Sequence, residues 1–374
     1  MTPLNEIIGQ ESAKKILLRS FNRKRLASTY LFYGPDGVGK WPLAISLAAL
    51  ANCIEPIKDE AEKVVDACGK CVNCRQILNL SFSELYLALP IPPHKSESEA
   101  IDHVSEFLEQ KKNDPYRAIS STRKLTIPIS MARVIKRAAA TKPPVNLTRV
   151  IFFYQMEKML PASADSLLKL IEEPPPSTII ILTTKDPENL LPTIQSRAQK
   201  ISFKPLTIAQ ISVYLMSRYD LKEEKANLYA RLAEGSVGRA IDMIEEADES
   251  PVRQSAFLMF KAILSKDTPS AVATVNDMLN PRNRGETEQI LSLWQTFLGD
   301  LIVLKYGNNP ENMVNIDLLP ELEGLTARIS APDAFAKMVS NIKDLYNSLD
   351  RNVHVRPAMT ALVFELRKYI NQSS

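Results

Sequence analysis

The sequence lacks any long apolar run. No segment of the 374 residues approaches the length that crosses a bilayer, and Met1 to Glu6 is polar, unlike the start of a secretory signal. We therefore expect a cytoplasmic protein, in which disulfides are rare. An excess of one charge is also missing, because 46 basic and 43 acidic residues leave a net charge of only +3. A net charge this small does not by itself indicate nucleic-acid binding.

Glycine is scarce as well: the chain has 11, and three of them lie in the loop 34–41, Gly-Pro-Asp-Gly-Val-Gly-Lys-Trp. The pattern G-x-x-x-x-G-K is that of a phosphate-binding loop, whose backbone amides and lysine hold phosphate groups. An apolar segment, 29–33, precedes the loop, and residues 43–51 have helical composition. Because strand, loop and helix follow in the order that the motif requires, a chance glycine-rich turn is the weaker interpretation. The expected nucleotide contacts are Gly34, Gly37, Gly39 and Lys40.

The loop lacks the hydroxyl residue that normally follows its lysine. Ser or Thr there holds the Mg²⁺ that bridges the β- and γ-phosphates, and Trp41 has no oxygen to offer. The apolar segment 150–153 is followed by Tyr154 and Gln155, where an ATPase needs Asp and usually Glu; neither side chain is negatively charged at pH 7. These two losses predict an ATPase scaffold that binds nucleotide weakly or not at all and hydrolyses none. Lys40 kept only as a relic is an equally open interpretation.

Apolar and helical segments alternate through the first 205 residues. Residues 11–27 have the apolar spacing of an amphipathic helix, and 161–173 form a predicted helix that ends at three prolines. Strands that are apolar throughout and alternate with helices indicate a parallel sheet covered on both faces. We therefore predict an α/β domain that ends near Pro205. Its expected strands are 29–33, 147–154, 178–184 and 199–203.

No convincing strand follows this domain. Residues 207–246 predict short helices around a glycine turn, and residues 250–371 predict longer ones, the last over 358–370. One longer helix carries an apolar stripe at helical spacing, typical of a core or a partner interface. The stripe consists of Ile290, Trp294, Phe297, Leu298 and Leu301. The predicted domains are 1–205, 206–247 and 248–374.

Residues 90–125 interrupt this regular pattern. Pro90, Pro92 and Pro93 precede a charged stretch of mixed sign, with one weakly amphipathic segment over 100–112. We expect an insertion or an exposed, mobile loop. The sequence does not indicate what it does.

All four cysteines lie between positions 53 and 74. Four thiolates complete the coordination of a structural Zn²⁺, and closely spaced Cys-x-x-Cys turns place thiolates on one metal. Because four ligands leave no open position, such a zinc would be structural and not catalytic. Free thiols or a redox pair are the alternative. The predicted zinc ligands are Cys53, Cys68, Cys71 and Cys74.

Several motifs occur together in this chain. Tyr-Leu-Phe-Tyr-Gly-Pro-x-Gly-Val-Gly-Lys at 30–40 is followed by the clustered cysteines and by Leu-Leu-Lys-Leu-Ile-Glu-Glu-Pro-Pro at 167–175. Leu-Pro-Thr-Ile-Gln-Ser-Arg stands at 191–197, and Leu-Trp-Gln-Thr-Phe-Leu-Gly-Asp-Leu at 293–301. In this order the motifs resemble those of the clamp-loader AAA+ proteins of bacterial replication. The resemblance implies a RecA-like AAA+ domain, a helical lid and a helical collar domain that oligomerises.

Within that family, the broken nucleotide site points to the non-hydrolysing delta-prime branch rather than the ATP-hydrolysing gamma/tau branch. The resemblance implies a ring of five subunits, with gamma/tau and delta subunits as partners, that loads a sliding clamp on primed DNA. The chain would then have no activity on its own, as a part of the DNA polymerase III holoenzyme.

The resemblance also assigns residues. The segment 196–198, Ser-Arg-Ala, matches the family's Ser-Arg-Cys, which implies that Arg197 is an arginine finger for the nucleotide of a neighbouring subunit. A surface arginine in an ordinary salt bridge is the alternative. Thr183 or Thr184 and Arg239 occupy the positions of the family's two phosphate sensors, and we expect structural roles for them because the local site is broken.

Two other functions stay open. One is an ATP-hydrolysing gamma/tau-like subunit, against which the absent metal ligands argue. The other is a zinc-containing DNA-binding protein on an inert ATPase fold, against which the near-neutral charge argues.

Overall fold

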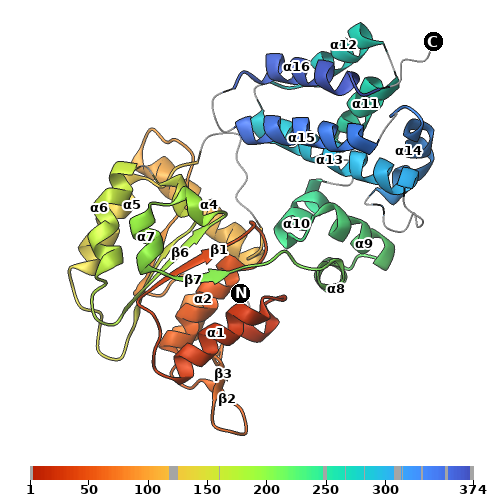
Figure 1. Ribbon diagram of the computed structural model, residues 1–374. Coiled ribbons are helices and arrows are strands. Elements are labelled where there is room, and N and C mark those ends of the chain that lie inside the picture. The colour runs from red at the N-terminus through yellow and green to blue at the C-terminus, as the bar shows by residue number, and fades with distance from the viewer. Residues whose placement is uncertain are drawn as a thin grey trace. The chain divides into compact units, whose positions relative to one another are not determined.

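The structure, a computed structural model, describes residues 3–117, 125–159, 161–246, 251–265, 267–281, 283–306, 313, 315–329, 332–349 and 353–370. The chain divides into two compact units, Met1–Asp242 and Met243–Ser374. The first unit contains a parallel sheet with helices, and the second is helical (Figure 1). The predicted fold class, an α/β domain followed by helices, is confirmed, whereas the bounds of the three predicted domains stay predictions. In the described parts of the chain, we find no helix whose length and apolarity would let it span a membrane.

Five parallel strands form the sheet of the first unit, in the order β4-β5-β6-β1-β7. Four of them are the strands expected from the sequence, and β4 is the additional one. β6 lies between β1, which leads into the phosphate loop, and β5, which ends next to Tyr154. The loop and the expected acidic positions therefore lie at the same edge of the sheet, beyond the carboxyl ends of its strands. The strands are β1 Thr29–Tyr33, β4 Leu85–Ala88, β5 Arg149–Phe153, β6 Thr178–Thr184 and β7 Gln199–Ser202.

Helices cover both faces of this sheet (Figure 1). Along β1, Tyr30 and Phe32 belong to one core and Leu31 to the other, because successive side chains of a strand point to opposite faces. The first core includes residues of α1 Glu11–Asn22, α2 Lys40–Asn52, α3 Val72–Leu78 and α4 Glu97–Asn113. The second includes residues of α5 Ile129–Ala139, α6 Pro161–Glu172 and α7 Pro192–Arg197.

Two helix boundaries differ from the prediction. α1 ends at Asn22 and not at residue 27, because Lys24 adopts a left-handed backbone with a φ of 53°. α2 begins already at Lys40, so Trp41 lies in its first turn. Smaller elements are the hairpin β2 Ile57–Lys58 and β3 Val64–Asp66, and the 3-10 turns Leu4–Glu6, Met156–Lys158, Pro187–Asn189 and Ile316–Leu318.

The segment 90–125 is not the exposed loop that its charge suggests. Much of it forms α4, which packs against the first face of the sheet. Phe107 and Lys111 of α4 are buried, and Tyr116 is buried just beyond the helix. The exposed, mobile loop is therefore wrong over α4, because Phe107 packs into the first core and Lys111, a residue type that is almost always exposed, is buried beside it. The alternative, an insertion, stays a prediction. Residues 118–124 lie outside the described residues.

Three helices, which we call the lid helices, follow β7 in the first unit. They match the short helices predicted over 207–246. The turn before the last of them needs Gly235, because its φ is +88° and a Cβ there would lie 2.5 Å from Cβ of Pro205. The lid helices also reach the phosphate loop, where the Gly238 amide donates to the Gly37 carbonyl at 3.2 Å. The lid helices are α8 Ile208–Tyr219, α9 Glu223–Leu232 and α10 Val237–Glu246.

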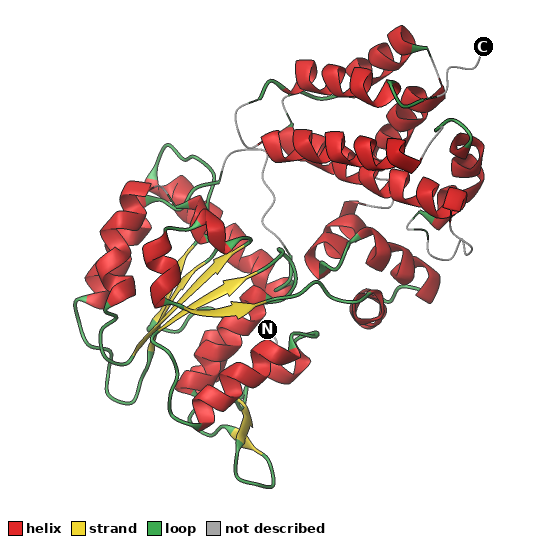
Figure 2. Cartoon of the chain, in the orientation of Figure 1, coloured by secondary structure: helices red, strands yellow, loops and turns green. Residues whose placement is uncertain are grey.

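The described residues of the second unit form helices and no strand (Figure 2). The stripe predicted on α13 is core and not a free interface, because each of its five residues is 0% exposed. At its centre, the indole N–H of Trp294 donates to the Ala256 carbonyl at 2.9 Å. The helix predicted over 358–370 is α16. The helices are α11 Pro251–Ser265, α12 Thr268–Met278, α13 Arg284–Tyr306, α14 Leu319–Thr326, α15 Pro332–Ser348 and α16 Val355–Arg367.

Trp294→Ala is expected to lower the free energy of unfolding of the second unit by about 3–5 kcal/mol, because it leaves a large cavity in an enclosed core. Leu258→Ala is the control: this side chain of α11 is 51% exposed, and its loss should change the free energy by less than about 0.5 kcal/mol. Urea unfolding followed by circular dichroism measures both. In Trp294→Ala, Trp41 is the only tryptophan left, so its fluorescence then reports on the first unit alone. Equal unfolding midpoints for the two variants would contradict the prediction.

Candidate functional site

Three glycines give the phosphate loop its shape. Gly34, Gly37 and Gly39 have φ angles of 138°, 70° and 112°, in a region that other residues rarely adopt. A Cβ at Gly34 would also lie 2.2 Å from the backbone oxygen of Phe203. The loop ends where α2 begins, so its last amides lie at the positive end of a helix. The backbone of an anion-binding loop is therefore retained.

The lysine of the loop is bound by the loop itself. Lys40 Nζ donates to the carbonyl oxygens of Gly34 and Pro35, to the latter at 2.7 Å. It also lies 3.3 Å from Oδ1 of Asp36. Burial lowers the pKa of Lys40, although the neighbouring carboxylate opposes this shift. The four residues predicted to contact nucleotide therefore share one loop, and nucleotide binding by them stays a prediction.

Gln155 binds this loop from the end of β5. Its Nε2 donates to Oδ2 of Asp36 at 3.1 Å, and Nζ of Lys185 lies 3.2 Å from the same oxygen. Burial raises the pKa of Asp36, but the ammonium groups of Lys40 and Lys185 outweigh it and leave this pKa below its ordinary value. The carboxylate of the loop is therefore ionised and already paired with lysines of the same chain.

Trp41 and Tyr154, at the two positions where an ATPase carries metal ligands, contact each other as rings. Their centroids are 5.3 Å apart with an interplanar angle of 86°. Phe107 of α4 and Phe152 of β5 lie 5.4 and 5.0 Å from the Trp41 ring and complete what we call the ring cluster. Burial raises the pKa of Tyr154 well above its ordinary value, so its hydroxyl stays neutral. Packed aromatic rings therefore occupy these two positions, and neither side chain is a carboxylate of the kind that Mg²⁺ prefers.

The residues at the two sensor positions are engaged in local contacts. Thr183 is fully buried at the end of β6, where its Oγ1 accepts a hydrogen bond from the backbone N–H of Gln155 at 2.9 Å. Thr184 Oγ1 donates to the Asp186 carbonyl at 3.0 Å. In the lid helices, Arg239 lies 2.6 Å from a carboxylate oxygen of Glu234. These contacts agree with the structural roles expected from the sequence.

Arg197 lies at the surface, at the end of α7. Its side chain is 43% exposed, and its Nε is 3.4 Å from Oε1 of Glu172 at the end of α6. Its Nη1 donates to the Thr193 carbonyl one turn earlier, at 3.2 Å. The guanidinium is therefore oriented by two neighbours of the same chain and is accessible from outside.

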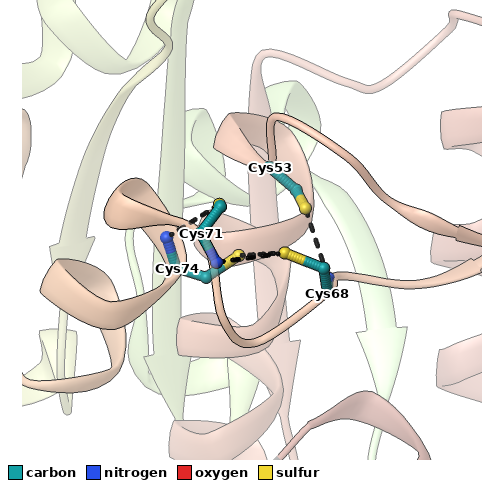
Figure 3. A group of neighbouring side chains, drawn as sticks. All are labelled: Cys53, Cys68, Cys71 and Cys74. Atoms are coloured by element: carbon teal, nitrogen blue, oxygen red, sulfur yellow. Dashed lines mark hydrogen bonds between the residues drawn. The ribbon is translucent and has the colours of Figure 1, made fainter.

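The four cysteines come together from two segments (Figure 3). Cys53 ends α2, and the other three lie in the turn before α3 and in its first turn. Their Sγ atoms all lie within 4.8 Å of one another. Zinc–sulfur bonds of about 2.3 Å in a tetrahedron place the sulfurs about 3.8 Å apart, so the cluster fits a zinc ion after a small contraction. The predicted ligand set Cys53, Cys68, Cys71 and Cys74 is therefore assembled.

Two residues of the site are missed by the sequence analysis. Glu172 pairs with Arg197, and nothing in the sequence indicates this pair. Lys111 places its ammonium over the ring cluster, 5.2 Å from the Trp41 centroid. The spacing of Lys111 and Phe107, one helical turn apart, is the only sequence signal that places them together.

Comparisons with known proteins identify relatives along the whole chain. The family described as "DNA polymerase III, delta subunit" matches residues 9–207. The chain is 25% identical to the DNA polymerase III subunit delta' of Bacillus subtilis, over 98% of both sequences. It is 22% identical to the subunit tau of the same organism, covering 92% of this chain and 56% of tau.

Among solved structures, the chain is similar to a DNA polymerase III gamma subunit-related protein from Thermotoga maritima, at 12% identity and a TM-score of 0.45. That alignment covers 96% of this chain and 99% of the other. The family match to residues 9–207 covers more than half of the chain, and the chain therefore belongs to the DNA polymerase III delta subunit family.

Proposed function

We propose that the chain is a clamp-loader subunit of the delta-prime kind that hydrolyses no ATP. It acts in a ring of five subunits, with gamma/tau and delta subunits as partners, that loads a sliding clamp on primed DNA. The family match and the similarity to a delta' subunit over 98% of both sequences support the assignment. The observation that carries the non-hydrolysing role is the ring contact between Trp41 and Tyr154.

An ATP-hydrolysing gamma/tau-like subunit is the second candidate, because the chain is also similar to tau. Hydrolysis requires Mg²⁺ between the phosphates and a residue that orients the attacking water. In this chain both expected metal-ligand positions carry aromatic residues, and the side-chain amide of Gln155 donates a hydrogen bond to the Asp36 carboxylate. These contacts favour the non-hydrolysing role.

Arg197 is the residue through which we propose that the chain acts on ATP. A guanidinium that reaches a neighbouring subunit's nucleotide stabilises the charge that develops on the transferred phosphoryl group. The exposed position of Arg197 allows this contact, and its bond to the Thr193 carbonyl and pairing with Glu172 orient it beforehand. The chain therefore contributes to the activity of the holoenzyme without a reaction of its own.

We propose that the cysteine cluster holds one structural Zn²⁺. The support is the donor chemistry: four sulfurs within 4.8 Å of one another match the coordination number and ligand type of structural zinc sites. When bound, the metal would join the end of α2 to the start of α3. Its four ligands leave no position for a water or a substrate.

The purified chain is expected to show no Mg²⁺-dependent ATP hydrolysis, because the oxygen ligands of the metal are missing at two separate positions. Phosphate release measures this. Trp41→Thr restores a hydroxyl but neither acid and should stay equally inactive, provided that it folds. Mg²⁺-dependent turnover by the unaltered chain would favour the gamma/tau-like candidate.

In the reconstituted complex, Arg197→Ala is expected to lower DNA- and clamp-stimulated ATP hydrolysis by at least about tenfold, because loss of an arginine finger removes transition-state stabilisation. Arg197→Lys keeps the charge without the planar fork and should recover little of the rate. Arg19→Ala, at an exposed position of α1, serves as the matched control and should leave the rate unchanged. Gel filtration must show an intact complex in each case. Unchanged turnover in Arg197→Ala would rule out the finger.

Elemental analysis of the purified chain is expected to find about one zinc per chain. Cys74→Ser should lose the metal, because three thiolates and a hydroxyl form a much poorer zinc site. Asn73→Ala is the matched control: its side chain lies between two ligands in sequence but donates to the Asn52 carbonyl, so its zinc should stay. Less than about half occupancy in the unaltered chain after gentle purification would count against the site.

A further inference from the structure

The ammonium of Lys111 is enclosed between α4 and the ring cluster. Its Nζ lies 5.2, 5.8 and 5.0 Å from the ring centroids of Trp41, Phe107 and Tyr154. It also donates to the carbonyl oxygens of Pro115, at 3.4 Å, and Arg117. Burial lowers the pKa of Lys111 to about 7. A side-chain amine of the chain thus lies over the two residues that replace metal ligands.

Tyr116 fills a second position beside the loop. It is 2% exposed, and its phenolic oxygen accepts from the Ile8 amide at 2.8 Å. Its ring packs against Tyr214 of α8, with centroids 5.4 Å apart. On another side, a Cβ built at Gly39 would lie 3.5 Å from the Tyr116 ring. The ring therefore stands between the last glycine of the phosphate loop and the lid helices.

An open groove of about 460 Å³ includes in its lining two residues that Tyr116 contacts. It is lined by Glu6 and Ile8 of the N-terminal segment and by α8 residues that include Val213 and Tyr214. Ile8 and Tyr214 are the residues that Tyr116 contacts. The Tyr116 side chain therefore separates an apolar groove from a phosphate loop, the two parts that a nucleoside triphosphate would need to occupy together.

The residues between Lys111 and Tyr116 are tied to the lid helices. The Tyr219 hydroxyl donates to the Asp114 carboxylate, and Arg218 donates to the Asn113 carbonyl at 3.0 Å. Arg117 follows Tyr116 in the sequence, and its Nε lies 3.4 Å from Oδ1 of Asp242 in α10. The segment 111–117 thus contacts the ring cluster, the phosphate loop and two lid helices at once.

We propose that the segment 111–117 is a built-in occupant of the nucleotide site, which excludes nucleoside triphosphates and holds the lid helices against the phosphate loop. The Lys111 side chain lies against the rings of Trp41 and Tyr154, the residues at the two expected metal-ligand positions. The Tyr116 ring closes the path from the loop to the groove. This assigns a role to the segment 90–125. The proposal rests on the proposed function in one respect: a subunit that hydrolyses nothing can dispense with an open site.

The first test is nucleotide binding by the full purified chain, measured by titration with a fluorescent ATP analogue without added Mg²⁺. The unaltered chain should show no saturable binding up to about 1 mM, whereas Tyr116→Ala should bind at least about tenfold more tightly, because the loop and Lys40 remain. Tyr306→Ala, an exposed tyrosine of the second unit, should behave like the unaltered chain. Tyr116→Ala that is folded yet still excludes the analogue would overturn the proposal, and so would tight binding by the unaltered chain.

A second measurement leaves the packed ring in place. Tyr219→Phe removes the hydroxyl that ties α8 to Asp114, and Asp114→Asn weakens the same tie. Backbone amides of the lid helices should then exchange with deuterium at least about tenfold faster. Amides of β6 should keep their rates and show that the sheet is intact. Lys112→Ala, next to Lys111 but paired with Glu109 on the surface, is the matched control. Unchanged exchange in the lid helices would overturn the bracing role.

Both measurements use the chain alone, whereas the Arg197 test uses the assembled complex. Results that contradict the proposed role of the segment 111–117 are therefore distinguishable from results that contradict the clamp-loader assignment.

Discussion

The contact between Trp41 and Tyr154 is the interaction on which the rest of the first unit depends. One ring belongs to the first turn of α2 and the other follows β5, so their packing joins the helix of the phosphate loop to the sheet. The same rings provide the surface on which α4 and its lysine lie. A hydroxyl at position 41 or a carboxylate at position 154 would need a polar partner in this core. Apolar packing and metal binding are therefore mutually exclusive here.

The phosphate loop and Arg197 differ in how they use their charged side chains, and the proposed function depends on this difference. In the loop, the side chains of Lys40 and Asp36 form their hydrogen bonds and ion pairs with groups of the same chain. Arg197 instead presents its guanidinium outward. Under the proposed function, a chain of this kind would complete a neighbouring subunit's nucleotide site and would have no nucleotide-dependent change at its own loop.

Much of this fold follows from local sequence signals. The strands 29–33 and 178–184 are continuous apolar runs next to breakers, and the glycine loop and cysteine spacing are patterns with a direct geometric meaning. The contacts of α4 do not follow, because enclosing Lys111 depends on rings that are distant in sequence. Likewise, nothing near Glu172 in the sequence identifies Arg197 as its partner. Local patterns predict which residue types meet a metal or a phosphate, but not which tertiary contacts already occupy them.

The cysteine cluster and the phosphate loop lie at opposite ends of one helix, α2. α2 has 13 residues, so it is a strut of about 20 Å, with Cys53 immediately beyond one end and Gly39 immediately before the other. Next to Cys53, the Asn52 side chain donates to the Thr148 carbonyl and accepts from the Thr148 amide, which fixes that end to the residue before β5. A strut held at both ends cannot slide along its axis. The position of the phosphate loop is therefore set in part from the far end of α2, where the cysteine cluster and the Asn52–Thr148 pair lie.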